Sequence, residues 1–193
     1  MRGEGLLVVI SGPSGVGKST IADLLVARGA AMRLTTATTR PAKPGEIPGR
    51  DYHFLTEEEF RRRIDSRYFL EYARVFDFLY GTPLDDVRLH LARGRTILLL
   101  LDVQGARLVR QTGLPAMYVF IAPPDAAALR ERLRGRAREN PEELAGRLGE
   151  AERELAARHE YDHVVVNDVS ERAAAAIAAL IAARRGADPP DTP

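Results

Sequence analysis

An apolar run, residues 6–10, leads directly into a glycine-rich segment, and this junction limits the possible folds more than any other part of the sequence. Residues 12–20 (GPSGVGKST) fit the pattern G-x-x-x-x-G-K-[ST], in which a buried strand passes through a tight loop into a helix. The glycines let the loop curl so that its backbone N–H groups point inward, and the helix that starts near Lys18 adds the positive end of its dipole. The loop is therefore an anion cradle. The alternative, a glycine-rich turn without a ligand, fits less well because the full pattern stands between a strand and a helix.

Two side chains of this loop predict what the cradle binds. Lys18 would reach the β- and γ-phosphates and the Ser19 hydroxyl would hold Mg²⁺, so we expect a magnesium-bound nucleoside triphosphate. Lys18 also departs from the composition of the chain, because Lys18 and Lys43 are the only lysines among 28 Lys and Arg residues. A compact ammonium fits between phosphate oxygens where a planar guanidinium would not.

The composition limits the partners and the compartment that we expect. Charges nearly cancel, with 28 Lys and Arg against 27 Asp and Glu, so no global field recruits nucleic acid or an anionic membrane. The chain has no cysteine, and its four histidines lack metal-ligand spacing, so we expect no disulfide and no structural metal. It starts with a strand pattern rather than a signal peptide, and its apolar stretches are too short to cross a bilayer. We therefore expect a cytoplasmic protein with no nucleic-acid or membrane partner. The sequence leaves the oligomeric state, monomer or weak dimer, open.

Apolar runs alternate with segments of helical spacing along most of the chain. With 193 residues and 45% hydrophobic content, the chain suits one domain with a substantial core. The alternation predicts an α/β fold in which helices flank a parallel sheet of buried strands. The expected strands are residues 6–10, 97–101, 117–121 and 164–166, and the expected helices lie near 18–28, 84–93, 125–135, 141–158 and 170–184.

Three segments depart from this alternation. Residues 35–84 hold short β-prone pieces broken by proline and glycine, with one charged helix from about 57 to 66, and indicate an inserted lobe. Residues 130–158 carry many arginines and glutamates, which is typical of a mobile helical cap. Residues 186–193 predict a frayed tail.

Several separate motifs, in order along the chain, carry a resemblance to a known family. They are residues 11–20 (SGPSGVGKST), 37–40 (ATTR), 44–46 (PGE), 51–54 (DYHF), 69–71 (FLE), 80–82 (YGT), 102–106 (DVQGA) and 166–168 (VND). From about residue 5 to 185 the sequence resembles the guanylate kinases, which move the γ-phosphoryl of ATP onto GMP. The resemblance implies one domain, 1–185, followed by a tail, 186–193. Within it we expect a P-loop NTPase core (1–34 and 85–185), an inserted mixed α/β nucleoside-monophosphate-binding lobe (35–84) and a helical lid (about 136–148).

The chemistry of guanine explains one residue of these motifs. Guanine presents N1–H and N2–H₂ as donors where adenine shows an acceptor at N1, so one carboxylate can tell the two bases apart. Glu71 is the candidate reader, and the alternative is a surface acid after a strand. The resemblance implies that Thr36 and Asp102 help to grip the base and that Thr82 adds a hydroxyl.

The resemblance also implies residues that hold the phosphates. Arg40, Lys43, Tyr52 and Tyr80 would hold the GMP phosphate, and arginine can do so through two parallel N–H bonds. Arg136 and Arg147 would close from the lid with help from Arg132, although any of these arginines could instead belong to a helix salt-bridge face. The implied ATP site comprises Gly12, Pro13, Ser14, Gly15, Val16, Gly17, Lys18, Ser19, Thr20, Arg132, Arg136 and, on the adenine side, Asn167. Catalysis would fall to Lys18, Arg40, Arg136 and Arg147 by positioning and charge, without a protein nucleophile.

Three positions depart from the pattern of the family. Thr36 stands where the family usually has serine, Lys43 where it has arginine, and Leu100 where it commonly has an acid two residues before Asp102. We expect a mild effect of Thr36 and weaker metal handling or lobe closure from Leu100. For Lys43 we expect either weaker phosphate binding or a site rearranged to use a point charge. Two other interpretations remain: an interaction module of the same fold that does no chemistry, and a kinase that acts on another phosphorylated compound.

Overall fold

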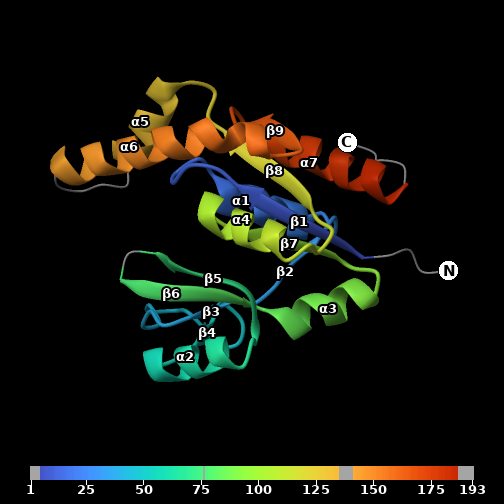
Figure 1. Cartoon of the computed structure of the whole chain (residues 1–193). Helices are drawn as coiled ribbons and strands as arrows, with labels where there is room; N and C mark the ends of the chain where they lie inside the picture. The colour runs from blue at the N-terminus through green and yellow to red at the C-terminus, as the bar shows by residue number, and fades with distance from the viewer. Residues whose placement is uncertain (1–4, 76, 135–140, 187–193) are drawn as a thin grey trace.

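A five-stranded parallel sheet forms the centre of the molecule, in the order β2-β7-β1-β8-β9 (Figure 1). The computed structural model describes residues 5–75, 77–134 and 141–186, without the side chains of residues 132–145. The strands are β1 (Leu6–Ser11), β2 (Met32–Arg33), β7 (Thr96–Leu100), β8 (Met117–Ala122) and β9 (His163–Val166). The predicted α/β fold with a helix-flanked parallel sheet is confirmed.

Strand β1 is wholly buried because helices cover both of its faces. On one face, Val8 and Ile10 pack with residues of α1 (Lys18–Ala27) and α7 (Ser170–Arg185). On the other face, Leu7 and Val9 pack with residues of α3 (Leu84–Ala92) and α4 (Val103–Gln111). A strand buried on both faces needs a continuous apolar run, which is the pattern that precedes the glycine-rich loop.

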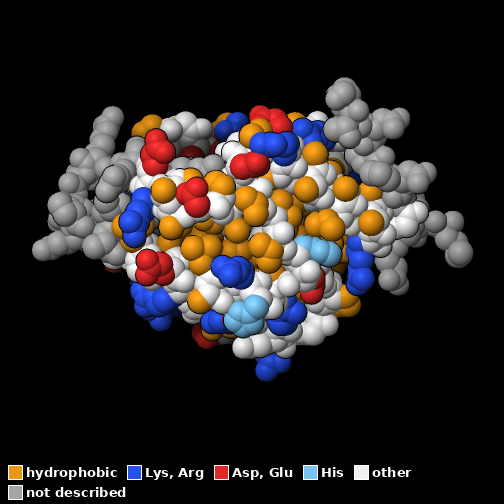
Figure 2. All heavy atoms as spheres, turned by 90° about the horizontal axis from the view of Figure 1, so that it is seen from above, with side chains coloured by type: hydrophobic (Ala, Val, Ile, Leu, Met, Phe, Trp, Pro, Cys, Tyr) orange, Lys and Arg blue, Asp and Glu red, His pale blue; other side chains and the backbone are white. Residues whose placement is uncertain are grey.

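Strand β9 corrects one prediction, because it is not fully buried. It pairs only with β8 and lies at the edge of the sheet. Val164 and Val166 are 47% and 50% exposed. Seen from above, hydrophobic side chains gather in the middle of this face of the molecule (Figure 2). An apolar run of three residues does not distinguish a central strand, which is buried on both faces, from an edge strand that packs only one face on the core.

Helix α4 and strand β2 were not predicted from the sequence. Asp102 caps α4, since its Oδ1 accepts the Gly105 N–H at 2.7 Å. The buried face of α4 comprises Val103, Ala106 and Val109, a spacing of three residues that follows a capping aspartate. This signal was present in the sequence, but it overlaps the motif at residues 102–106. Strand β2 has only two residues, too few for any periodicity.

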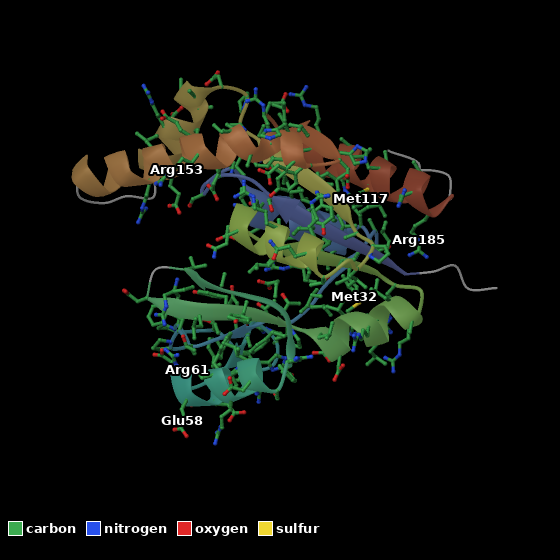
Figure 3. All side chains as sticks on the ribbon, in the orientation of Figure 1. Met32, Glu58, Arg61, Met117, Arg153 and Arg185 are labelled. Carbon is green, nitrogen blue, oxygen red and sulfur yellow. The ribbon has the colours of Figure 1, made fainter. Side chains whose placement is uncertain are left out.

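A second, mixed sheet lies beside the core in the order β4-β3-β6-β5 (Figure 1). Its strands are β3 (Ala37–Thr38), β4 (His53–Phe54), β5 (Phe69–Val75) and β6 (Phe78–Pro83). Helix α2 (Glu57–Asp65) covers this sheet by packing Phe60 against Phe69. Its outer side is charged: Glu58 points away from the sheet in Figure 3, and Arg61 binds Glu57 at 2.7 Å. This agrees with the charged helix expected from about residue 57 to 66.

The remaining helices follow β8. They are α5 (Ala126–Arg134), α6 (Pro141–Ala156) and a 3₁₀ turn, η1 (Ala157–Glu160). Leu129 of α5 packs with Ala151 of α6, and Leu155 joins α6 to the core beside Phe120. The predicted helices at 125–135 and 141–158 are therefore present with nearly the expected bounds. No helix in the described ranges is long and apolar enough to cross a membrane.

Candidate active site

The glycine-rich loop between β1 and α1 has a backbone that only glycine can adopt at two positions. Gly12 and Gly17 have φ of +144° and +100°. A Cβ on Gly12 would lie 2.2 Å from the carbonyl oxygen of Ile121, and one on Gly17 would lie 2.5 Å from Asn167 Nδ2. The loop is thus pressed against β8 and the end of β9, and it curls as the sequence predicted.

Lys18 is the first residue of α1, and its ammonium folds back over the loop. Its Nζ donates to the Gly12 carbonyl, and to the Pro13 carbonyl at 3.1 Å. Ser19 and Thr20 follow in the first helical turn, where both are exposed. A cation and the N-terminus of a helix therefore meet at one place, which favours a bound anion.

Asn167 holds this loop in place through two hydrogen bonds. Its Nδ2 donates to the Val16 carbonyl at 2.7 Å, and its backbone N–H donates to the Ala122 carbonyl at 2.8 Å. The side chain is buried. The structure thus gives Asn167 a part in shaping the loop, while the predicted contact on the adenine side stays a prediction.

A second cluster lies on the mixed sheet, around Arg40. Its guanidinium carbon lies 5.5 Å from the ring centre of Tyr52, and the rings of Tyr52 and Tyr80 are 6.1 Å apart, edge to face. Nη2 of Arg40 donates to both carboxylate oxygens of Glu46, at 2.8 and 3.1 Å. The structure thus brings together three of the four residues expected at the GMP phosphate. The fourth, Lys43, has an exposed side chain and contributes its backbone N–H, which donates to Glu46 at 2.7 Å.

Glu46 is a member of this cluster that the sequence did not single out beyond its motif. Hydrogen bonds from Arg40 and from the Lys43 N–H hold the pKa of the Glu46 carboxyl below its usual value. The same carboxylate, with a smaller contribution from Tyr80, raises the pKa of Arg40. Both groups are therefore charged at neutral pH, and Glu46 fixes the orientation of the guanidinium.

Glu71 is a buried carboxylate of the second sheet. It lies on β5 and is 6% exposed, and the hydroxyl of Thr82 on β6 donates to its Oε1 at 2.6 Å. Burial raises the pKa of Glu71 to about 7, although the bond from Thr82 opposes this, and the nearby Asp102 raises it further. The interpretation of Glu71 as a surface acid is therefore wrong.

Gly105, in the first turn of α4, lets this helix approach both carboxylates. A Cβ at Gly105 would lie 3.3 Å from Asp102 Oδ1 and 3.5 Å from Glu71 Oε2. Glu71, Thr82 and Asp102 therefore converge at the start of α4. Thr36 lies just before β3, where its carbonyl accepts the His53 N–H at 2.8 Å.

Comparison with known proteins identifies the family. A sequence model described as guanylate kinase matches residues 4–184. The chain belongs to the guanylate kinase family. It is 44% identical over 183 residues to a guanylate kinase of Symbiobacterium thermophilum, covering 94% of this chain and 87% of that protein. It is 41% identical to one of Caldanaerobacter subterraneus, covering 96% and 90%. The crystal structure of guanylate kinase from Anaplasma phagocytophilum superposes with a TM-score of 0.77 at 31% identity, covering 95% of this chain and 88% of that chain.

The residues expected to form a lid in this guanylate kinase family member are described only in part. Arg136 and the side chain of Arg132 lie outside the described residues. Arg147 lies on α6 and is half-buried. The predicted roles of these arginines therefore stay predictions.

The residues near the loop fit a magnesium ion that travels with its nucleotide. Ser19 offers an exposed hydroxyl beside Lys18, and the phosphates and water would complete the magnesium shell. In the part of the chain that the structure describes, no group of three or more His, Cys, Asp or Glu could hold a metal ion. Mg²⁺ suits such a place, because it keeps several waters and is commonly bound by one or two protein groups and by substrate phosphates.

Proposed function

We propose that this protein transfers the γ-phosphoryl of MgATP directly to GMP, and also to dGMP, giving ADP and GDP or dGDP. The observation that carries the proposal is the burial of Glu71, a carboxylate that lies beside Thr82 and Asp102 where the second sheet meets the start of α4. An acceptor oxygen of the GMP phosphate attacks the γ-phosphorus, and the bond to the β,γ-bridging oxygen breaks. ADP leaves with that electron pair.

The glycine-rich loop supplies the ATP side of this site. Backbone N–H groups of residues 12–20 and the Lys18 ammonium would hold the β- and γ-phosphates, with Asn167 shaping the loop. Ser19 would hold Mg²⁺, which when bound neutralises charge on the phosphates. Arg132, Arg136 and Arg147 would approach from the lid, about residues 136–148. Since the transition state is loose, fixed positive charge around the phosphoryl oxygens is the main contribution of the protein.

The lobe formed by residues 35–84 supplies the GMP side. Arg40 would bind the phosphate through N–H groups that Glu46 leaves available, with the hydroxyls of Tyr52 and Tyr80 and the side chain of Lys43 adding further contacts. The core, residues 1–34 and 85–185 apart from α6 and the lid, would stay fixed while this lobe closes, so that the phosphate of GMP comes into line with ATP.

Base recognition would fall to Glu71. Its carboxylate can accept N1–H and N2–H₂ of guanine together, with Thr82, Asp102 and Thr36 around the ring. Adenine would place a lone pair against the same carboxylate and leave buried charge unpaired, which can reduce kcat/KM by roughly 10⁴-fold in favourable cases. We further propose a place in purine nucleotide metabolism in the cytoplasm, with ATP and GMP as the partners of the protein.

An acceptor panel tests this proposal. Release of ADP is measured with GMP, dGMP, AMP, UMP and CMP, for the wild type and for Glu71→Gln. GMP should be the fastest acceptor, and Glu71→Gln should lower kcat/KM for GMP by about 10²-fold or more, because the amide places a donor against N2–H₂. Glu58→Gln, on the exposed side of α2, is the matched control and should change nothing. Preference for another acceptor would contradict the base assignment, and MgATP binding without transfer would favour an interaction module.

A further inference from the structure

Glu154 of α6 reaches the glycine-rich loop from a distant part of the chain. Its carboxylate lies near the Ser14 backbone N–H and the Lys18 ammonium, and both groups favour its charged form. The side chain is half-buried, whereas its neighbours Glu152 and Arg153 are exposed. Burial raises the pKa of this carboxyl, and attraction by Lys18 opposes the rise.

Packing of α6 explains why Glu154 is held there. Ala151, three residues earlier, is buried against Leu129 of α5. Leu155, the next residue, packs beside Phe120 of β8. Strand β8 also carries the Ile121 carbonyl that Gly12 approaches. The end of α6 is therefore fixed on the strand that supports the loop, and Glu154 extends from it to the loop.

The partners of Glu154 are the groups to which the proposed function assigns the phosphates of ATP. A backbone N–H of the loop and the ammonium of Lys18 would bind phosphate oxygens, and here they interact with a carboxylate. Two further carboxylates, of Glu150 and Asp102, lie close enough to repel Glu154. A polyphosphate brought to the same groups would add more negative charge at short range, and like charges there are unfavourable.

Arg147 lies on the same face of α6 as Glu154. The two residues are seven apart, which is about two helical turns and roughly 10 Å. Because a helix moves as a rigid rod over this length, any displacement of Glu154 from the loop also shifts Arg147.

We propose that Glu154 competes with the phosphates of the nucleotide for the loop, so that binding of ATP displaces this carboxylate and repositions α6 with Arg147. The inference rests on the proposed function of the loop. It makes Glu154 a positioning residue rather than a catalytic residue. It also implies that a charged side chain at this position weakens nucleotide binding.

Calorimetry with MgADP tests this inference without turnover. Glu154→Gln keeps the size of the side chain and removes its charge, so it should bind MgADP about three- to tenfold more tightly than the wild type. Glu152→Gln, the same charge change on the exposed side of α6, should stay within about twofold of the wild type. Thermal unfolding of each variant checks that the fold is retained.

The outcomes separate the inference from the function on which it rests. If the wild type binds MgADP and Glu154→Gln binds equally or more weakly, the inference is wrong and the proposed function stands. If Glu152→Gln tightens binding as much as Glu154→Gln, the effect is one of net charge and the inference is also wrong. If the wild type binds no MgADP, both are overturned.

Discussion

The two phosphate sites that we propose for this protein are built in different ways. The loop at residues 12–20 is made of backbone, and its glycines at φ of +144° and +100° approach neighbouring groups so closely that no side chain fits. The cluster around Arg40 is made of side chains, with an arginine, two tyrosines and the carboxylate of Glu46 on a small sheet. A site made of backbone depends on the core that shapes it, whereas a site made of side chains can be altered one group at a time.

The first prediction concerns Lys18, the charged side chain of the glycine-rich loop. Lys18→Ala should lower kcat by about 10³-fold, because it removes the full positive charge that the ammonium places over the loop. The midpoint of thermal unfolding should change by less than about 3 °C. Retained turnover would show that the backbone N–H groups of the loop hold the phosphates without Lys18. It would contradict the role proposed for this side chain.

The second prediction tests the dependence of the loop on the core. Gly12→Ala should lower the free energy of unfolding by about 3 kcal/mol or more, because it adds a clash with the Ile121 carbonyl to backbone strain. Gly113→Ala is the matched control, since Gly113 has φ of +72° with nothing near its Cβ position, and should cost only about 1 kcal/mol. Urea unfolding measures both. Equal losses would mean that close packing does not shape the loop.

The third prediction uses pH and concerns the guanine side. The pKa of Glu71 rises on folding from its ordinary value of 4.5 to about 7, so the folded state holds the proton more tightly than the unfolded state. Stability from this group is therefore fully present below pH 4.5 and is lost as pH rises to about 7, a change of roughly 3 kcal/mol. Glu71→Gln should remove this loss, as urea unfolding at pH 5 and pH 8 would show. A wild type and variant with the same pH profile would contradict it.

Binding of GMP should show the opposite trend with pH. Only the ionised carboxylate accepts two donors from guanine, so affinity for GMP should increase as pH rises through about 7. Titration calorimetry of the wild type should also record release of a proton on binding at pH 6. An affinity for GMP that does not change with pH would contradict the assignment of Glu71 to recognition of the base.

The fourth prediction removes one group of the side-chain site. Arg40→Ala should raise KM for GMP about 10- to 100-fold and leave KM for ATP within about twofold, because the guanidinium lies only on the GMP side. Arg61→Ala, an exposed arginine of α2 in the same lobe, is the control. A matching rise in KM for ATP would mean that the two sites are not independent.

The smallest expected effect is at Lys43. Because its side chain is exposed and its backbone N–H already binds Glu46, Lys43→Arg should lower KM for GMP only about two- to fivefold, by adding a forked donor. Lys43→Met should raise KM by a similar factor. No change with either variant would show that only the backbone of this residue takes part.

The same difference between the sites explains what the sequence could predict. The loop after β1 was recognisable because backbone geometry requires particular glycines and a flanking strand, and those requirements are visible locally. Arg40, Tyr52 and Tyr80 were identified only through resemblance to a family, because their positions along the chain say nothing of their distance in space. Glu46 was overlooked as a partner of Arg40 for that reason.

Other features depended on tertiary context. Glu154 stands among glutamates of similar spacing, and only the packing of Leu155 on the core singles it out. The burial of β9 was overestimated because three valines do not reveal how many neighbours a strand has. Helix α4 could have been predicted from Asp102 as its cap and from the apolar residues at spacings of three that follow it.

The bond from Asn167 to Val16 also has a consequence for biosynthesis. The two residues are 151 positions apart, and β1 is flanked by strands made of residues 96–100 and 117–122. The nucleotide loop leaves the ribosome among the first segments, yet the groups that shape it are translated near the end. A nascent chain therefore cannot acquire its full affinity for ATP until almost the whole polypeptide has been synthesised.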